Sequence, residues 1–279
     1  MPYKTVLVIL RSEEDCDHVL DEAIQMTRSF DAHLIGLHAE AAVKVSYAAP
    51  IEIPDASVFQ TDQGEMDERM GAMGSKFKEK CDREGVSWEW RPIRSLSGDN
   101  ALSALSSARC ADIVVVRQHE EEKEDDSADL EALVLEGGRP VLFVPYVGRT
   151  TGPIKKAVVG WNGSREAARA VWDSLPFLTA AESVEILCVD PEENVEQSKS
   201  MAGAEIAAAL TRHGAKVSVN TEISDGLPAA AIIQNRMADT GADLLIMGAY
   251  SKSRLREYLF GGVTRTMLQS MPNLTLMSR

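Results

Sequence analysis

The feature that most constrains the fold of this 279-residue chain is an internal repeat of apolar, strand-like segments. Four segments of the second half match segments of the first half in the same order: residues 156–160 match 4–8, 184–190 match 34–40, 242–246 match 111–115, and 272–277 match 140–145. The offset falls from 152 residues for the first pair to 131 for the third, so the first copy carries about 21 extra residues. The pattern predicts one fold used twice, with an insertion near residues 40–62.

Within each copy, short apolar runs alternate with segments of helical hydrophobic period. Such alternation predicts an α/β protein with right-handed crossovers and helices on both faces of the sheet. We therefore expect two consecutive Rossmann-like domains, each a mostly parallel five-stranded sheet flanked by helices. The turn-rich segment 147–153 is the expected linker between residues 1–147, with the insertion, and residues 153–279.

Two helices carry specific expectations. A helix over residues 165–178 is expected to face the core with Ala168, Val171, Trp172 and Leu175. A second helix, over residues 65–84, follows an irregular excursion at 40–62 that contains Pro50 and Pro54. It carries an apolar stripe that indicates core filling, with an adaptable binding face as the alternative; the stripe consists of Met66, Met70, Met73, Phe77 and Cys81.

Composition and charge narrow the classes of partner. Residues 1–150 hold 16 Lys and Arg against 29 Asp and Glu, a net charge of −13, whereas residues 151–279 carry −1. An acidic field repels phosphate backbones, so nucleic acid and anionic membranes are not expected partners. No apolar stretch approaches the roughly 20 residues of a membrane span, and the N-terminus lacks a signal-peptide pattern, which favours a cytoplasmic location. The scattered cysteines and histidines indicate neither disulfides nor a metal site.

The loops at the carboxyl ends of the strands are the expected ligand-binding region, because ligands of such sheets bind there. In the second copy these loops cover residues 161–164, 189–191 and the stretch from 248. Asn162 could bind a base or ribose, and the alternative is an Asn-Gly turn followed by Ser164 as a helix N-cap. In the same way, an acidic cluster that starts with Asp190 could supply an acid or base, or simply begin a helix.

The stretch from residue 248 combines glycines with basic residues. Gly248 permits a close approach, Ser251 offers a hydroxyl, and Gly261 and Gly262 leave backbone N–H groups bare at the start of a helix. Four basic residues surround them: Lys252, Arg254, Arg256 and Arg265. A phosphate chain could bind here, and a solvated strand-to-helix turn is the alternative.

The standard catalytic and nucleotide fingerprints do not occur in the sequence. It contains neither G-x-x-x-x-G-K-[ST] nor a strand-to-helix G-x-G-x-x-G, and no H-E-x-x-H or nucleophile-elbow arrangement. We therefore expect a protein that is not an enzyme. Slow ATP hydrolysis stays open as an alternative, although the residues indicate no base for it.

Two stretches, VVGWNGSREAARAV at residues 158–171 and MGAYSKSRLREYLFGGVTRTML at 247–268, together with the closing strand at 274–277, resemble the universal stress protein family. The whole chain looks like a tandem member, with the first copy similar only in strand order and in its opening and closing segments. Members that bind ATP share a loop of the form G-x2-G-x9-G-[ST]. Here Gly248 and Gly261 match, while Ser251 and Gly262 replace the second Gly and the Ser or Thr.

The resemblance also implies the rest of a nucleotide site. Asn162 stands where the family has Asp, Val189 takes the place after strand two, and Thr264 is near enough for its hydroxyl to compensate in part. The implied ligand is an adenine nucleotide, ATP with Mg²⁺, bound weakly. The residues of the implied site are Asn162, Val189, Gly248, Ser251, Gly261, Gly262, Val263 and Thr264.

For the first copy the resemblance implies no nucleotide binding, because its loop at 117–126 lacks glycine. It further implies that the closing strands 140–145 and 274–277 pair, so that the two domains pack as an intrachain pseudo-dimer, and two chains could form a homodimer. The implied function is a non-catalytic stress response. A nucleotide-independent scaffold that contacts an unknown protein partner through the 40–62 excursion and the acidic first half is the alternative.

Overall fold

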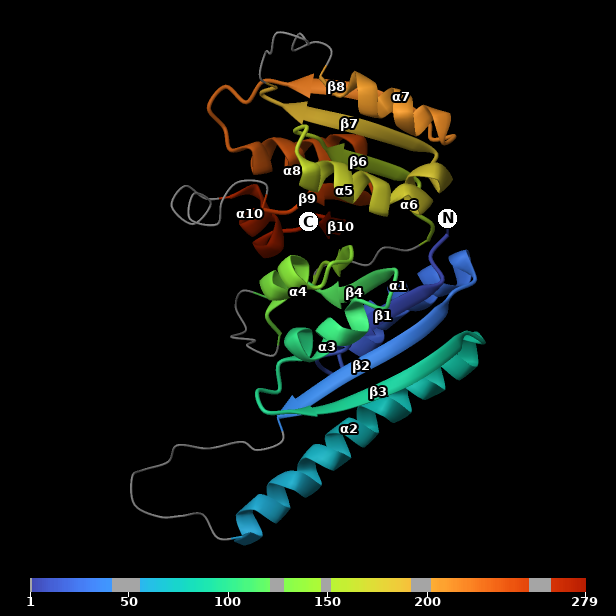
Figure 1. Ribbon diagram of the computed structural model, residues 1–279, viewed down its shortest axis with the longest axis vertical. Coiled ribbons are helices and arrows are strands. Elements are labelled where there is room, and N and C mark those ends of the chain that lie inside the picture. Colours follow the sequence, from blue (N-terminus) through green and yellow to red (C-terminus); the bar gives the residue numbers. More distant parts are fainter. Residues whose placement is uncertain (1, 42–55, 121–127, 147–151, 192–201, 251–261) are drawn as a thin grey trace. The chain divides into compact units, whose positions relative to one another are not determined.

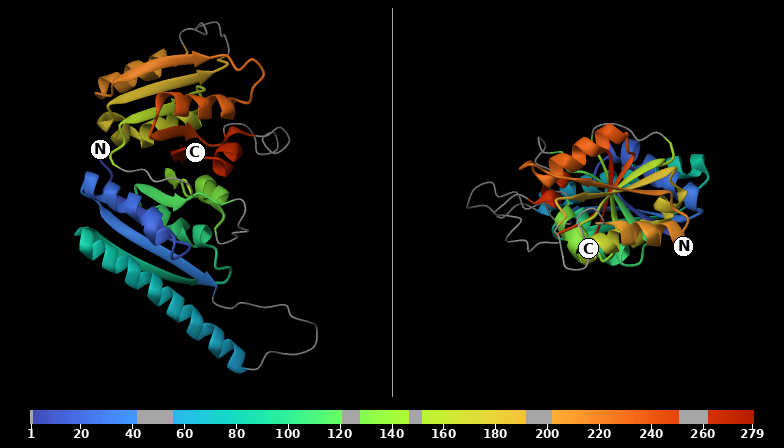
Figure 2. Two further views of the ribbon diagram at one scale, coloured as in Figure 1. Left: turned by 180° about the vertical axis from the view of Figure 1, so that it is seen from behind. Right: turned by 90° about the horizontal axis from the view of Figure 1, so that it is seen from above.

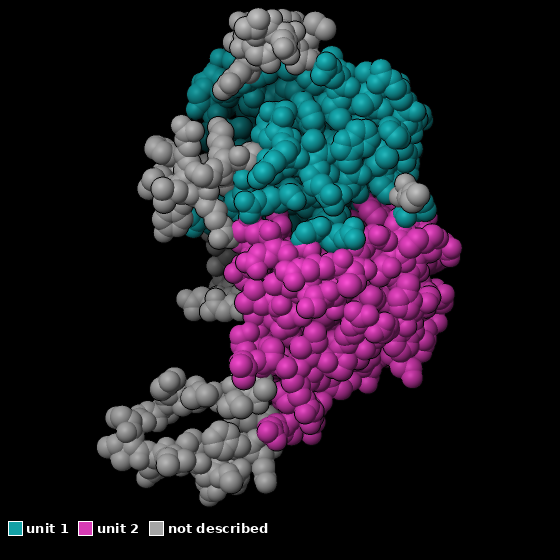
Figure 3. All heavy atoms as spheres, in the orientation of Figure 1, with its two compact units in different colours: residues 1–2, 117–124, 138–279 teal, residues 3–116, 125–137 magenta. Residues whose placement is uncertain are grey.

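The structure, a computed structural model, describes residues 2–41, 56–120, 128–146, 152–191, 202–250 and 262–279 (Figure 1). Two compact units divide the chain (Figure 3). The N-terminal unit comprises residues 3–116 and 125–137, and the C-terminal unit comprises residues 1–2, 117–124 and 138–279. Among the described helices, none is long and apolar enough to span a membrane.

The N-terminal unit contains four parallel strands in the order β3-β2-β1-β4. Helices α1 and α2 pack together on one face of this sheet, and α3 and α4 pack together on the other (Figures 1 and 2). The strands are β1 (Thr5–Ile9), β2 (His33–Ala41), β3 (Ser87–Ser95) and β4 (Ile113–Arg117). The helices are α1 (Asp15–Phe30), α2 (Ala56–Glu84), α3 (Asn100–Ala108) and α4 (Leu130–Glu136).

The C-terminal unit contains six strands in the order β5-β10-β9-β6-β7-β8, all parallel to their neighbours except β5. The strands are β5 (Val141–Val144), β6 (Lys156–Gly160), β7 (Ser183–Val189), β8 (Val217–Glu222), β9 (Leu244–Gly248) and β10 (Leu274–Ser278). The helices are α5 (Arg165–Asp173), α6 (Leu175–Ala180), α7 (Ala204–Arg212), α8 (Ala229–Thr240) and α10 (Val263–Gln269). The predicted α/β class and the Rossmann-like alternation are confirmed.

The two units begin with the same hydrogen bonds. In the N-terminal unit one carboxylate oxygen of Asp112 accepts the backbone N–H groups of Lys4 and Thr5, at 2.7 and 2.9 Å. In the C-terminal unit one oxygen of Asp243 accepts those of Lys155 and Lys156, at 2.8 and 2.9 Å. Asp112 directly precedes β4, and Asp243 directly precedes β9. Each aspartate therefore joins the start of that strand to the start of the neighbouring strand, β1 or β6. We call the two contacts the aspartate clamps.

The predicted pairing of the closing strands is confirmed, and it occurs inside the C-terminal unit. β5 runs antiparallel to β10, with Phe143 opposite Thr275 and Leu142 opposite Leu276. All of β5 and β10 is buried, including the polar residues Thr275 and Ser278 of β10. The last strand of the first sequence copy thus belongs to the compact unit formed by the second copy. The packing of whole domains as a pseudo-dimer stays a prediction.

Two helices differ from the sequence-based prediction. α2 begins at Ala56, nine residues before the expected start, so the irregular interpretation is wrong for residues 56–62, while 42–55 lie outside the described residues. The sequence has no proline between Pro54 and Pro92, so no proline interrupts α2. Gly64 does not interrupt α2 either, because a single glycine inside a helix costs only about 1 kcal/mol. The buried stripe confirms core filling, with Met66, Met70, Met73, Phe77 and Cys81 all at 7% exposure or less.

The expected helix over residues 165–178 is two helices that meet at Ser174. Pro176 lies in the first turn of α6, where a residue without a backbone N–H is tolerated. Inside a continuous helix from α5, the same proline would remove a backbone hydrogen bond. The inward face is also partly wrong. Val171 is buried as expected, but Trp172 is 44% exposed. Ala167 and Ala170 complete the buried side of α5 in place of Trp172.

Candidate functional site

The candidate site lies at the carboxyl ends of β9, β6 and β7 in the C-terminal unit. Gly160, the last residue of β6, pairs with Leu187 of β7 on one side and with Met247 of β9 on the other. The chain leaves β6 toward β7 and returns to β9 on the opposite side, so strand order reverses here. This reversal is where open α/β sheets form a ligand crevice. The loops that contain Asn162, Val189 and Gly248 therefore follow three neighbouring strands, as the sequence predicts (Figure 1).

Asn162 and Ser164 form a turn and a helix cap. The Oδ1 atom of exposed Asn162 accepts the backbone N–H of Ser164 at 3.1 Å. The Ser164 hydroxyl oxygen accepts the N–H of Ala167 at 3.1 Å, which caps α5. The interpretation as turn and cap is thus confirmed. Recognition of a base or ribose by Asn162 stays a prediction, and its Oδ1 already has a partner in the protein.

Val189 ends β7 and is half-buried at the carboxyl end of that strand. The following residue, Asp190, has a φ of 45°, donates its N–H to the carbonyl of Glu222 at 3.0 Å, and accepts the N–H of Ser224 at 2.9 Å. Asp190 therefore joins the ends of β7 and β8. This structural task accounts for its position better than the acid or base role considered above.

Gly248 meets the backbone of α5. A Cβ atom at this position would lie 2.4 Å from the backbone nitrogen of Ala167 and 2.5 Å from the carbonyl carbon of Glu166. Real Cβ atoms do not approach backbone so closely. The close approach predicted for Gly248 therefore exists, but its partner is the first turn of α5. Glycine is required here for strand-to-helix packing.

A hydrogen bond joins the end of β9 to the start of α10. Tyr250 has the uncommon φ of 55° and donates its backbone N–H to the Thr264 hydroxyl oxygen at 3.1 Å. Gly262 precedes α10 as a buried N-cap without a side chain, so Val263 and Thr264 present first-turn N–H groups. Thr264 is 2% exposed. The structure thus brings Gly248, Gly262, Val263 and Thr264 together, whereas Ser251 and Gly261 lie outside the described residues.

Glu166 is a charged residue of this region to which the sequence pattern assigns no role. Its side chain is buried and accepts a hydrogen bond from Arg165 Nε at 2.6 Å. Burial acts to raise the pKa of Glu166, but hydrogen bonds from Arg165, its own backbone N–H and Ser164 outweigh burial and lower the pKa below the ordinary value. The Glu166 carboxylate is thus paired with Arg165 in the first turn of α5, and the backbone of that turn lies against Gly248. The sequence does carry a signal for Glu166, because it stands two residues after the N-cap Ser164, where a negative charge favours the start of a helix.

The equivalent edge of the N-terminal unit is occupied by its own side chains. The Arg11 side chain is 4% exposed, its Nε lies 3.7 Å from Asp15 Oδ2, and the same oxygen accepts the Arg11 backbone N–H at 2.8 Å. His38 bonds the carbonyl of Leu10 through Nδ1 at 2.7 Å and lies 3.3 Å from Glu40 through Nε2. A buried Arg–Asp pair therefore follows β1 at the place where Asn162 follows β6.

Glu40 extends this polar chain to α2, since Arg69 donates to it at 3.2 and 3.4 Å. Burial acts to raise the pKa of Glu40, but the hydrogen bond and charge of Arg69, with smaller contributions from His38, lower it. Within the described part of the chain, no group of three or more His, Cys, Asp or Glu could hold a metal ion.

Comparisons with known proteins agree with this architecture. Residues 153–279 match the family model described as the universal stress protein family. No curated protein sequence matches the chain. Over 99% of its length the chain resembles a solved universal stress protein from Archaeoglobus fulgidus DSM 4304, with a TM-score of 0.71, 13% identity and 98% of that chain covered. A putative universal stress protein from Pseudomonas aeruginosa UCBPP-PA14 gives a TM-score of 0.60 and 14% identity, with 99% and 93% covered.

The two structural likenesses show the fold alone, whereas the family model identifies the second half by sequence. Strands β6 to β10 of the C-terminal unit, with the segments that follow β6, β7 and β9, fall within the matched residues, whereas β5 lies before them. The chain therefore carries a universal stress protein domain at residues 153–279, within a fold that it shares along its whole length with solved universal stress proteins.

Proposed function

We propose that this protein is a non-catalytic, cytoplasmic stress-response protein whose C-terminal domain binds an adenine nucleotide weakly, with ATP and Mg²⁺ as the ligand to test. The observation that carries the proposal is the bond from the Tyr250 N–H to the Thr264 hydroxyl. It holds the first turn of α10 beside the end of β9, at the point where strand order reverses.

The first turn of α10 is the proposed phosphate contact. Val263 and Thr264 carry N–H groups that lack acceptors within the helix, and Gly262 adds no side chain in front of them. Such N–H groups favour an anion. Magnesium needs little from the protein in this arrangement, because Mg²⁺ commonly binds through phosphate oxygens and water.

One feature supports weak rather than tight binding. Asn162 supplies an amide where the resembling family has a carboxylate, and its Oδ1 atom is already bonded. The N-terminal unit is proposed not to contribute, since Arg11 and Asp15 are buried at the equivalent edge.

Isothermal titration of the full chain with ATP and Mg²⁺ tests the proposal. Gly262 has a φ of −84°, which aspartate adopts without strain, so Gly262→Asp adds a negative charge at the first turn of α10 while keeping a good N-cap. We expect it to weaken binding at least about tenfold. Asn235→Asp adds the same charge to an exposed position of α8 and should leave the affinity within about twofold. If the wild type and Gly262→Asp give equal heats of ATP binding, the site assignment is refuted. Equal heats from the wild type and Gly261→Asp would refute it as well.

A second candidate is a nucleotide-independent scaffold that contacts a protein partner through the acidic first half, whose described surface includes two exposed leucines. Leu96 is 93% exposed directly after β3, and Leu102 on α3 is 44% exposed. Deletion of residues 42–55 should then abolish capture of a protein partner while thermal stability stays near that of the wild type. Unchanged capture would count against a scaffold that uses this segment.

A further inference from the structure

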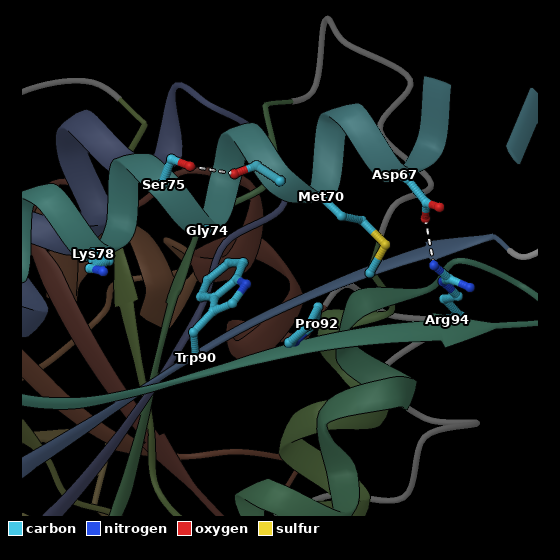
Figure 4. Close-up of a pocket in the computed structure, with 9 residues that line it drawn as sticks. Asp67, Met70, Gly74, Ser75, Lys78, Trp90, Pro92 and Arg94 are labelled. Carbon is cyan, nitrogen blue, oxygen red and sulfur yellow. Dashed lines mark hydrogen bonds and ion pairs between the residues drawn. The ribbon is translucent and has the colours of Figure 1, made fainter. Parts of the chain in front are cut away.

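A groove in the N-terminal unit lies between α2 and β3, away from the crevices at the strand ends (Figure 4). Its volume is about 740 Å³. One wall is a stripe of α2 that runs from Asp67 to Lys78, about 16 Å along the helix. The other wall is one face of β3, formed by Trp90, Pro92 and Arg94 at alternate positions. We call this feature the α2–β3 groove.

Two glycines of α2 make the groove hollow. A Cβ atom on Gly74 would lie 2.8 Å from the Trp90 Nε1 atom, so the glycine lets the indole ring lie against the helix. A Cβ atom on Gly71 would meet nothing within 4 Å, which marks the open part of the groove. Met70 and Pro92 border this opening (Figure 4). The floor is therefore apolar and shaped to receive a flat group.

The polar groups of the groove are mostly hydrogen-bond donors. Lys78 is exposed, and among the residues that the structure describes its ammonium has no hydrogen-bond or ion-pair partner. Trp90 packs on Phe77 with ring centroids 5.1 Å apart, and its indole N–H, whose nitrogen lies beside Gly74, has no acceptor in the described part of the chain. At the other end Asp67 accepts from Arg94 at 2.6 Å, so the acidic side chain of the lining is already neutralised.

We infer that the α2–β3 groove binds a small organic carboxylate with a flat apolar body. The apolar body would lie on the Trp90 ring between Met70 and Pro92, in the space that Gly71 leaves open. The carboxylate would accept from Lys78 and from the Trp90 indole N–H, which supplies the acceptor that both donors lack. The net charge of −13 on this half of the chain opposes an anion, so Lys78, whose ammonium is unpaired within the described lining, is the group that selects the acid over its neutral analogue.

Proton–nitrogen NMR of the full chain with 2-naphthoate as the probe tests this inference, because the four tryptophans give separate indole signals. The Trp90 signal, assigned with Trp90→Phe, should shift with a dissociation constant on the order of 1 mM. The amide analogue, 2-naphthamide, should bind about tenfold more weakly. Lys78→Gln should weaken binding of the acid about tenfold, whereas Lys216→Gln in the C-terminal unit should leave it unchanged.

Gly71→Leu supplies the steric test. Its side chain would enter open space, and leucine favours helix over glycine, so the variant should fold and yet fill the groove. Gly64→Leu is the matched control, since Gly64 is also an exposed helical glycine with nothing within 4 Å but does not line the groove. Loss of the Trp90 shift only in Gly71→Leu supports the inference. Binding by Gly71→Leu at wild-type strength, or equal affinity for the acid and the amide, would overturn it.

Discussion

At the residue scale, one half-buried carboxyl group gives this protein an unusual dependence on pH. Burial, with a smaller contribution from neighbouring Asp21, raises the pKa of Glu22 on α1 from 4.5 to about 7. The folded protein therefore binds this proton more tightly than the unfolded chain does. The stabilising contribution is complete below pH 4.5 and is lost as the pH rises toward 7.

Glu22→Gln should remove this penalty. At pH 8 the variant is expected to be more stable than the wild type by on the order of 1–3 kcal/mol, and at pH 4.5 the two should be nearly equal. Urea unfolding followed by circular dichroism at both pH values measures the difference. Glu79→Gln, at an exposed position of α2, is the control and should change little at either pH. The same gain for Glu22→Gln at both pH values would contradict a titration effect.

The candidate site could be located from sequence, but the tasks of its residues could not. Apolar runs and glycines indicated which loops lie at the carboxyl ends of the strands, because strand order and crossover handedness follow from the alternation of elements. The partner of Gly248 is the backbone of α5, a contact between residues about 80 positions apart that no local pattern encodes. The Tyr250–Thr264 bond was similarly unpredictable, since it depends on an uncommon backbone φ.

At the element scale, the aspartate clamps fix where the first strand of each unit begins. Each carboxylate oxygen accepts two backbone N–H groups that stand at the start of the strand. These hydrogen bonds are exposed or part-buried, so water replaces part of what is lost, and removal of a clamp costs on the order of 0.5–1.5 kcal/mol. The two clamps are similar in length, so the effect of removing either should be similar.

Asp112→Ala and Asp243→Ala should each lower the free energy of unfolding by about 0.5–1.5 kcal/mol. The matching Asn variants keep an acceptor oxygen and should lose less than half as much. Chemical denaturation of the full chain, followed separately by tryptophans of each half, measures both losses. Asn variants as unstable as the Ala variants would show that charge, rather than acceptor geometry, makes the clamps.

Element boundaries were predictable where a local signal exists. In α1 (Asp15–Phe30) the signal is clear, because the apolar positions Val19, Leu20, Ala23 and Ile24 recur at helical spacing. The break at Ser174 was missed because Pro176 fits the first turn of a new helix as readily as it ends an old one. The early start of α2 was missed because the prolines before it pointed to an irregular segment.

At the scale of the whole molecule, the two halves of the sequence and the two compact units of the structure divide at different places. Residues 141–144 belong to the first copy by sequence and to the C-terminal unit by their antiparallel ladder with β10. The repeat predicted the existence of this strand. The unit to which β5 belongs depends on its pairing with β10, more than 130 residues away, and periodicity alone does not specify that pairing.

Hydrogen exchange of the full chain can test this grouping. Phe77 is fully buried in the N-terminal unit, and Phe77→Ala should destabilise that unit by about 3–5 kcal/mol. Backbone amides of β1–β3 should then exchange faster, while those of Leu142 and Phe143 in β5 should keep the protection of β10. If β5 instead loses protection together with β1–β3, it belongs energetically to the first half.

The buried Arg11–Asp15 pair has a consequence for how the molecule would report a ligand. A chain with two equal clefts could respond to rising nucleotide concentration with interacting sites and a curve that departs from a simple hyperbola. In the N-terminal unit the equivalent edge holds the Arg11 and Asp15 side chains. If the C-terminal unit binds nucleotide as proposed, we expect saturation at one equivalent per chain and a melting temperature that rises with the logarithm of the nucleotide concentration above the dissociation constant.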